Sequence, residues 1–273
     1  MLALALLLAA LCRRLALGRR DLGYGLPAGR FLAVAALWSL VGMATASLGA
    51  MFLLGTGLRE FADPHAVASV AQWSRWLLSG LASGIAVALI EESVMRGAMH
   101  SAIARESGVW AAALLTAPLF AVLHFFAKAS IPADQVTLGS GFALLSLSFA
   151  PLGHPALVAD SFLAWLAVGL ILSLTRVLTG NIATAIGLHA GWVVVLRVLQ
   201  QSSVRGGGAD YSAWVGQFDG LLGYWLLPWA AAIGAGLWLT RAAWTPYASG
   251  ADGAGGASGA SLSSRPIGSS SSR

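Results

Sequence analysis

Long runs of apolar residues dominate the chain, and short segments with most of the charged residues separate them. A helix needs about 20 mainly apolar residues to cross the hydrocarbon core of a bilayer. Six runs approach or exceed this length: Phe31–Leu54, Trp76–Ala104, Gly108–Ala127, Ser161–Leu178, Ile182–Gln200 and Gly220–Thr240. The pattern therefore predicts an all-α fold, a polytopic bundle of about six to eight transmembrane helices.

Other segments account for the two ends of the chain and one internal loop. Met1–Leu11 is a further apolar run that fits a short span or a signal-type segment. No small-residue cleavage site follows it, so we interpret it as a retained helix that forms, with the basic loop after it, residues 1–30. Phe142–Ala150 is too short to cross a bilayer and is predicted to be re-entrant or interfacial. The bundle then occupies residues 31–245, and the Gly/Ser-rich residues 246–273 are predicted to be disordered.

The composition supports a membrane protein and excludes several other classes. The chain is 58% hydrophobic and 10% charged, whereas soluble domains contain about 25% charged residues. Its single cysteine, Cys12, excludes an intramolecular disulfide framework. Eleven tryptophans suit anchoring at membrane interfaces. The net charge of +5 comes almost entirely from arginines scattered among loops, which argues against a nucleic-acid-binding patch.

Arginine and lysine positions predict the orientation in the membrane, because cytoplasmic loops contain an excess of both. One group precedes the first long span and is predicted to be cytoplasmic: Arg13, Arg14, Arg19, Arg20 and Arg30. Alternation of the spans places the Arg96–Arg105 end, Arg176 and Arg241 on the same side. The opposite side receives Arg59, Arg75, Lys128, Arg197 and Arg205.

Of the eleven acidic residues, only Glu91 and Glu92 fall well inside a predicted span. Ionisable residues at that depth are costly and by default mark a functional site. The alternative is that the helix ends at Ile90 and that both carboxylates lie at the surface. No helix breaker follows them, however, and a helix from Trp76 to Arg105 places Glu91 roughly 20 Å from either end. This depth favours a site within the membrane.

Spacing along the helix separates the two carboxylates. Glu92 and Arg96 are four residues apart, so they share a helix face and are predicted to form an ion pair. Such a pair is the condition for burying Arg96. Glu91 points about 100° away around the helix and has no basic residue on its own face. We therefore interpret Glu92 and Arg96 as structural support and Glu91 as a candidate general base.

Histidines in two later spans extend this cluster. His124 lies at about the depth of Glu91, whereas His189 is shallower and needs a tilted helix to come level with them. A single intramembrane histidine often only hydrogen-bonds to a neighbouring helix. Three ionisable groups on three helices at compatible depths instead favour a functional cluster. The other histidines, predicted to lie in outer loops or on the supporting face, are His65, His154 and His100.

Three motifs, in this order, resemble those of the CPBP family, which contains the type II CAAX prenyl proteases and the bacteriocin-processing Abi proteins. "EESVMRG", which begins at Glu91, resembles the EExxxRG motif of the family. "FAVLH", Phe120–His124, looks like its FxxxH motif. "FLAWLAVGLILSLTRVLTGNIATAIGLHAGW" is similar to the stretch that precedes and contains its HxxxN motif. The resemblance covers about Leu81 to Gln200.

The resemblance implies a glutamate-dependent intramembrane endopeptidase that requires no metal or other cofactor. Glu91 and His124 match the family residues that activate water, and His189 matches the histidine that stabilises the oxyanion. Glu92 and Arg96 match the remaining motif positions. The expected partners are membrane lipids and a membrane-associated protein or peptide substrate, with no nucleic acid. We expect the protein in the membrane, with the bacterial inner (plasma) membrane as the location.

The chain departs from the family at one position. Val193 stands where the last motif usually has an asparagine, four residues after His189, and its side chain cannot donate a hydrogen bond. Loss of one oxyanion donor elsewhere costs about 10²–10³ in rate. Three alternatives are open: another donor substitutes, activity is low, or this subfamily works without the donor. Trp192 is a weak candidate for a replacement donor, and Asn181 is interpreted as a helix cap.

Several functions remain open at this level. The substrate of a peptidase could be a lipid-modified C-terminus, a leader or bacteriocin-like peptide, or a C-terminal membrane anchor, and no sequence feature indicates recognition of a prenyl group. Because Val193 replaces the expected asparagine, a non-catalytic membrane scaffold or immunity protein is a second alternative. A metallopeptidase is a third reading, because two Glu and two His are plausible zinc ligands, although no HExxH motif occurs. A transporter is disfavoured, because no second half of the chain mirrors the first.

Overall fold

The computed structural model describes residues 10–244, apart from residues 11, 64, 66–68, 127–129, 154, 208–213, 217 and 219. The predicted N-terminal apolar helix (except residue 10), Lys128, His154 and the predicted disordered tail lie outside the described residues.

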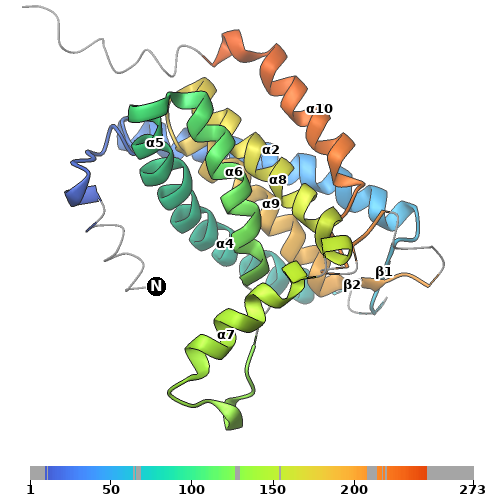
Figure 1. The fold of residues 1–273 in the computed structure, drawn as a ribbon. Coiled ribbons are helices and arrows are strands. Elements are labelled where there is room, and N and C mark those ends of the chain that lie inside the picture. Colours follow the sequence, from blue (N-terminus) through green and yellow to red (C-terminus); the bar gives the residue numbers. More distant parts are fainter. Residues whose placement is uncertain are drawn as a thin grey trace, which may run out of the picture.

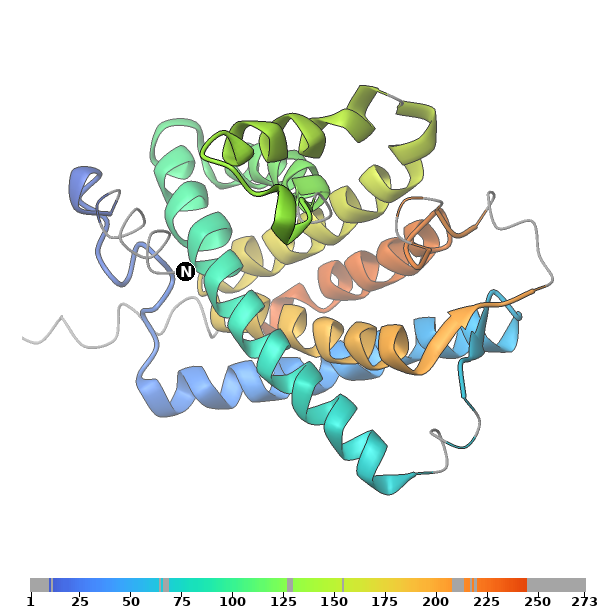
Figure 2. The same ribbon diagram turned by 90° about the horizontal axis from the view of Figure 1, so that it is seen from below.

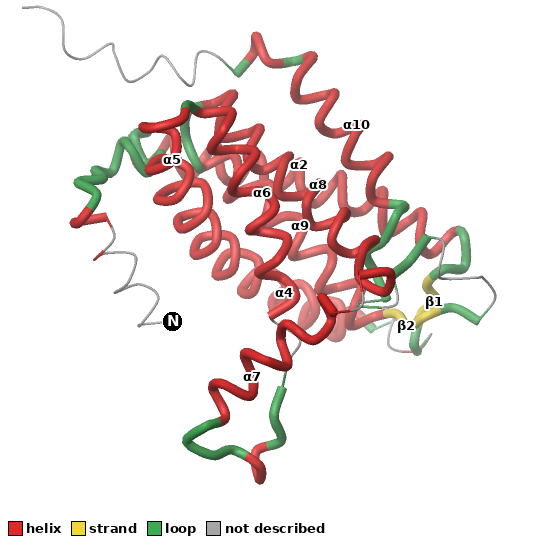
Figure 3. Tube along the Cα trace, viewed as in Figure 1, coloured by secondary structure: helices red, strands yellow, loops and turns green. Residues whose placement is uncertain are grey.

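Helices make up nearly all of the regular structure in the described part of the chain (Figures 1 and 3). They are α2 (Ala28–Gly55), α4 (Val70–Glu92), α5 (His100–Ser107), α6 (Val109–Phe126), α7 (Ser140–Phe149), α8 (Pro155–Thr179), α9 (Ala183–Ser202) and α10 (Leu226–Leu239). A π-helical segment, Ser93–Met99, joins α4 to α5, and short 3₁₀ segments cover Ala133–Gln135, Ala150–Gly153 and Arg241–Ala243. The all-α transmembrane bundle is confirmed.

One small sheet departs from a purely helical fold. Strand β1 (Arg59–Phe61) pairs antiparallel with β2 (Ser203–Arg205), with Glu60 opposite Val204. The pair lies at the end of the bundle where α2 and α9 both finish (Figure 1). It connects the ends of these two helices.

Four helical stretches of the described residues are long and apolar enough to cross a membrane: Ala28–Gly55, Val70–Ser107, Ala156–Thr179 and Ala183–Ser202. Three shorter apolar helices accompany them, corresponding to α6, α7 and α10. Each of the six predicted spans therefore coincides with a helix or a continuous helical stretch. The predicted short segment Phe142–Ala150 is α7, which extends away from the bundle in Figure 1.

Three helices begin six residues away from their predicted starts, and local chemistry explains these differences. α4 begins six residues before Trp76, because the Ser69 hydroxyl caps the helix by accepting from the amide of Gln72. α8 begins at Pro155, since proline suits the first turn of a helix. α10 begins at Leu226 and not at Gly220, because Gly220 has a φ of +67° and belongs to a loop.

Helix α9 forms the centre of the bundle. It packs against α2, α4 and α8, and thirteen of its twenty residues are buried. Figure 2 shows α4 crossing α9 and α2. α6 packs on α8 on the other side of the site. These contacts bring α4, α6 and α9 together around one volume.

Two glycines explain how closely the backbones around α9 approach. A Cβ on Gly191 would collide with the carbonyl oxygen of Ser39 in α2 and would lie 2.7 Å from the amide nitrogen of Met43. A Cβ on Gly84 in α4 would lie 2.7 Å from the carbonyl oxygen of Ala190. Close helix approach in membranes depends on such small residues.

We predict that Gly191→Ala lowers the midpoint of thermal unfolding in detergent, because overpacking of a close contact costs about 1–3 kcal/mol. Gly234→Ala in α10 is the matched control, since its Cβ would meet no atom within 4 Å. Equal midpoints for the two variants would contradict the close-contact explanation.

Candidate active site

Three helices bring the predicted site residues together. Glu91 lies at the end of α4, His124 near the end of α6, and His189 in the first half of α9. Glu91 Oε2 is 3.9 Å from His124 Nε2, and Glu92 Oε1 is 2.9 Å from His189 Nδ1. The depth difference predicted for His189 therefore does not keep it away from the other groups.

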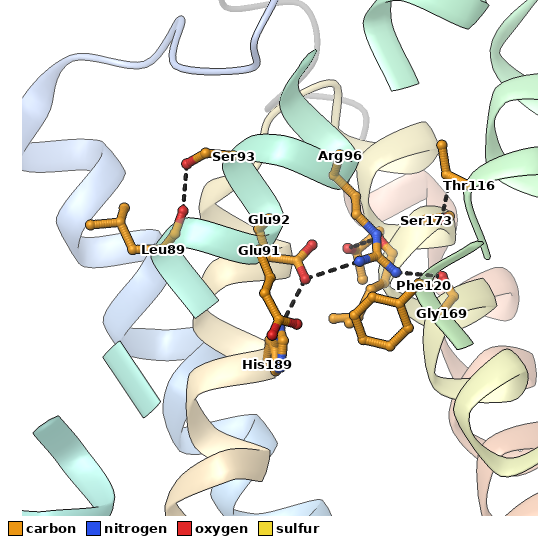
Figure 4. A network of polar contacts seen from close by, with 12 residues as sticks. Leu89, Glu91, Glu92, Ser93, Arg96, Thr116, Phe120, Gly169, Ser173 and His189 are labelled. Atoms are coloured by element: carbon orange, nitrogen blue, oxygen red, sulfur yellow. Dashed lines mark hydrogen bonds and ion pairs between the residues drawn. The ribbon is translucent and has the colours of Figure 1, made fainter. Parts of the chain in front are cut away.

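Glu92 is the centre of a buried polar network (Figure 4). Its Oε1 accepts from Arg96 Nη1 at 3.1 Å and from the His189 ring at 2.9 Å. Arg96 also donates from Nη2 to the carbonyl oxygen of Gly169 in α8, at 2.9 Å. The side chains of Glu92 and Arg96 are completely buried. The predicted Glu92–Arg96 ion pair is thus present, and it connects α4, α8 and α9.

Phe120 covers this pair from the α6 side. The Arg96 guanidinium carbon lies 4.4 Å from the centre of the Phe120 ring, a distance typical of a cation–π contact. The same ring lies 6.0 Å, centre to centre, from His189. The buried Phe120 ring therefore packs over the ion pair and stabilises the cation.

The π-helical segment Ser93–Met99 carries Arg96 into the bundle. π-helical turns are rare and occur frequently at functional sites. Ser93 donates to the carbonyl oxygen of Leu89 at 2.5 Å, and its hydroxyl lies 2.6 Å from that of Tyr24 in the N-terminal segment. These bonds secure the backbone directly after the two glutamates.

The ring of His124 is held in one orientation. Its Nδ1 lies 2.8 Å from the carbonyl oxygen of Phe120, which can only accept, so Nδ1 carries the proton of the neutral ring. Trp165 of α8 stacks on the ring with centres 3.7 Å apart. The unprotonated Nε2 consequently faces Glu91 Oε2, a buried atom with no hydrogen-bond partner among the described residues.

Two cavities meet at His124. The larger one, of about 650 Å³, is lined by His124, His189, Val193 and Trp165 at one end and by Arg59, Arg197 and Gln200 at the other. The smaller one, of about 190 Å³, lies between α4 and α6 and is lined by Glu91, Val94, Leu123 and His124, among others. Most of both walls is apolar. A chain-like ligand that passed from one cavity into the other would cross the Glu91–His124 pair.

Arg59 belongs to the far wall of the large cavity. Its Nε donates to the Ser203 hydroxyl at 3.0 Å, Nη1 donates to the carbonyl oxygen of Gly220 at 3.2 Å, and Nη2 donates to the carbonyl oxygen of Ser203. Burial, and then the charge of Arg205, lower the pKa of Arg59 below its ordinary value. Its bonds fix the loop before α10 against the strand pair.

The three residues considered for the missing oxyanion donor have different surroundings. Val193 lines the large cavity. Trp192 is not a spare donor, because its indole N–H donates to Thr45 Oγ1 at 3.0 Å. Asn181 does cap α9, accepting from the amide of Ala183 at 3.0 Å.

The histidines given little weight do not enter this site. His65 is exposed and donates from its backbone amide to Asp63. His100 is buried beyond Arg96, and its Nδ1 has no hydrogen-bond partner among the described residues. No three His, Cys, Asp or Glu side chains of the described residues are grouped as a metal site would require.

Sequence reasoning missed three members of the site: Phe120, Trp165 and the carbonyl group of Gly169. Phe120 begins the motif that ends at His124, and a spacing of four residues indicates a shared helix face. Trp165 and Gly169 belong to a span without polar side chains at these positions, so no local signal distinguishes them. The bond between His189 and Glu92 was also not predicted.

Comparison with known proteins gives one family. The family model of type II CAAX prenyl endopeptidase Rce1-like proteins matches residues 73–195. No curated protein and no solved structure matches the chain. The matched region begins in α4 and ends in α9, so it contains Glu91, His124 and His189.

We predict that Arg96→Met destabilises the fold by about 3–5 kcal/mol, because removal of one partner leaves the other charge buried and uncompensated. Arg105→Met is the control: Arg105 pairs with Asp21 at 3.3 Å, and both side chains are 43% exposed, so its loss should cost at most about 1 kcal/mol. Unfolding in detergent measures both, and equal losses would refute the compensating role of Arg96.

Proposed function

This chain belongs, through residues 73–195, to the family of CAAX-type CPBP proteases, and we propose that it is a glutamate-dependent intramembrane endopeptidase. Its substrate is a membrane-associated protein or peptide. The observation that carries the proposal is the position of Glu91 Oε2 opposite His124 Nε2, 3.9 Å apart, where a 190 Å³ and a 650 Å³ cavity meet.

The first step is activation of water. Two acceptors 3.9 Å apart are too distant to bond directly, but one water can donate a hydrogen to each of them. Its lone pair is then directed away from both acceptors and toward a carbonyl carbon in the cavity. As the oxygen attacks, its proton passes to Glu91, and His124 holds the second hydrogen.

The second step requires a donor for the oxyanion. The Nδ1–H of His189 is directed at Glu92, so the ring stabilises an oxyanion through Nε2 only when that nitrogen also carries a proton. Glu92 orients the ring by accepting from Nδ1–H, as a carboxylate behind a catalytic histidine does in other hydrolases. The tetrahedral intermediate then collapses, and the proton on Glu91 transfers to the leaving amine.

Glu92 and Arg96 act on the reaction through His189. Arg96 and His189 both donate to Glu92 Oε1, so the guanidinium fixes the carboxylate and the carboxylate fixes the ring. We assign these two residues as positioning groups and Glu91, His124 and His189 as catalytic groups.

A non-catalytic membrane scaffold is the second candidate, and Val193 is the observation that favours it. Val193 lines the large cavity on the same helix as His189, at the position where an asparagine donor is expected. A scaffold would keep the fold but would not cleave a peptide bond. Substitutions of the proposed catalytic groups would therefore change the function of a peptidase and leave that of a scaffold unchanged.

We predict that Glu91→Gln and His124→Ala each abolish processing, because loss of a general base typically costs about 10²–10⁴ in rate. The measurement compares membrane proteomes of cells with the wild-type protein and with each variant, and expects at least one protein to remain unprocessed only with the variants.

Glu106→Gln and His65→Ala are the matched controls for these substitutions. Both residues are exposed and lie outside the site, so they should leave processing unchanged. Identical proteomes for wild type and Glu91→Gln, with both proteins folded and equally abundant, would favour the scaffold.

We predict that Val193→Asn raises the cleavage rate by up to about 10²-fold on the substrate found in this way, because it adds a donor beside the developing oxyanion. Val193→Leu adds volume without a donor and should not raise the rate. A rate unchanged by asparagine would place the oxyanion away from Val193.

A further inference from the structure

The large cavity extends from the site toward one end of the described bundle. From His189 it follows α9 to Arg197 and Gln200, both of which line the cavity and are exposed. Gln200 lies eleven residues beyond His189, which corresponds to about 16 Å along the helix. The site therefore opens at the end of the bundle that carries β1 and β2 (Figure 1).

The other end of the site is closed by a buried arginine. Arg176, near the end of α8, is 9% exposed. Its Nε donates to the carbonyl oxygen of Arg96 at 3.2 Å, its Nη2 to that of Asp21 at 2.8 Å, and its Nη1 to that of Gly180. These three acceptors belong to the π-helical segment, the N-terminal segment and the turn before α9. Arg176 thus seals the junction of the three.

Further hydrogen bonds hold the N-terminal segment against the closed end of the bundle. The hydroxyl of Ser101 donates to the carbonyl oxygen of Asp21 at 2.5 Å, and the amide of Ile182 donates to that of Gly23 at 3.1 Å. Leu17 of this segment and Ile182, directly before α9, are both buried. The N-terminal segment therefore covers the end of the bundle nearest to Arg96.

The two ends differ in charge. Among the described residues, the closed end contains eight arginines and two acidic residues: Arg13, Arg14, Arg19, Arg20, Arg30, Arg105, Arg176 and Arg241, with Asp21 and Glu106. The open end contains four arginines and four acidic residues: Arg59, Arg75, Arg197 and Arg205, with Glu60, Asp63, Asp134 and Asp160. By the excess of arginine in cytoplasmic segments, the closed end is cytoplasmic.

From the closed arginine-rich end and the open opposite end, we infer that the active-site cavity opens on the extracytoplasmic face of the membrane. The inference rests on the proposed peptidase function and narrows its substrate. The substrate is a segment of an exported or membrane-bound protein that is presented from the outer side. Entry from the closed end is blocked, because Arg176 and the N-terminal segment stand between that end and His189.

The walls of the cavity fit such a segment. Trp192, Trp225 and Trp229 line the passage between His189 and the open end, and they provide an apolar surface for a chain that emerges from the bilayer. Arg197 at the mouth adds a positive charge. An apolar segment with an acidic or carboxyl-terminal group on the outer side matches this arrangement.

The sidedness can be measured by cysteine labelling, since Cys12 is the only cysteine of the chain. Cys12 itself and Ser107→Cys report on the closed end. Ala62→Cys reports on the open face, and Gln200→Cys reports on the cavity mouth. The three introduced cysteines are studied in a Cys12→Ser background, in the full chain expressed in bacterial cells. The probe is a membrane-impermeant maleimide, applied to intact spheroplasts and to permeabilised ones.

We expect Ala62→Cys and Gln200→Cys to react in intact spheroplasts, and Cys12 and Ser107→Cys to react only after permeabilisation. A cytoplasmic marker protein that stays unlabelled shows that the spheroplasts are intact. The reverse pattern, labelling of both ends from outside, or a Gln200→Cys that reacts only after permeabilisation would overturn the inference.

Labelling does not depend on cleavage, so this test is separate from that of the peptidase function. The same four reporters in a Glu91→Gln background should give the same pattern. An inactive protein with the expected labelling would therefore reject the proposed reaction and keep the sidedness, whereas an active protein with the reverse labelling would do the opposite.

Discussion

Compensation of buried charge at Glu92 is the constraint on which the rest of the structure depends. A carboxylate and a guanidinium with no exposed surface are tolerated in an apolar bundle only if each meets its partners at short range. Glu92 meets Arg96 and His189, and Arg96 meets Gly169 and Phe120. Four helices must therefore hold fixed positions relative to one another, and the catalytic geometry follows from that requirement.

Close packing around α9 makes this precision possible. Lipid tails are as apolar as leucine side chains, so helices in a membrane associate through tight contact and hydrogen bonds. Gly84 and Gly191 let the backbones of α4 and α2 touch α9, and this contact sets the depth at which His189 meets Glu92. The geometry of the site thus depends on Gly84 and Gly191, which have no reactive side chain.

Apolar run length and i,i+4 spacing were enough to predict the spans and the Glu92–Arg96 pair, because both are local properties of one helix. The bond between His189 and Glu92 depends on the rotation and tilt of two helices, which no local pattern contains. The π-helical segment and the stacking of Trp165 on His124 likewise could not be predicted from the sequence, since they arise from tertiary packing. The prediction of the α10 start was wrong for a related reason. Gly220 continues an apolar run in the sequence, but in the structure it belongs to a loop.

The helices around the two adjacent glutamates give them different surroundings. Oε1 of Glu92 accepts from two nitrogen donors, although its Oε2 has no partner among the described residues. Glu91 Oε2 also has no hydrogen-bond partner there and lies 3.9 Å from His124 Nε2. A protease must also hold its substrate on both sides of the scissile bond, and His124 is the side chain that lines both cavities. In the proposed reaction, water activation and chain binding therefore converge on the Glu91–His124 pair, and Glu92, one residue away, orients His189 without transferring a proton.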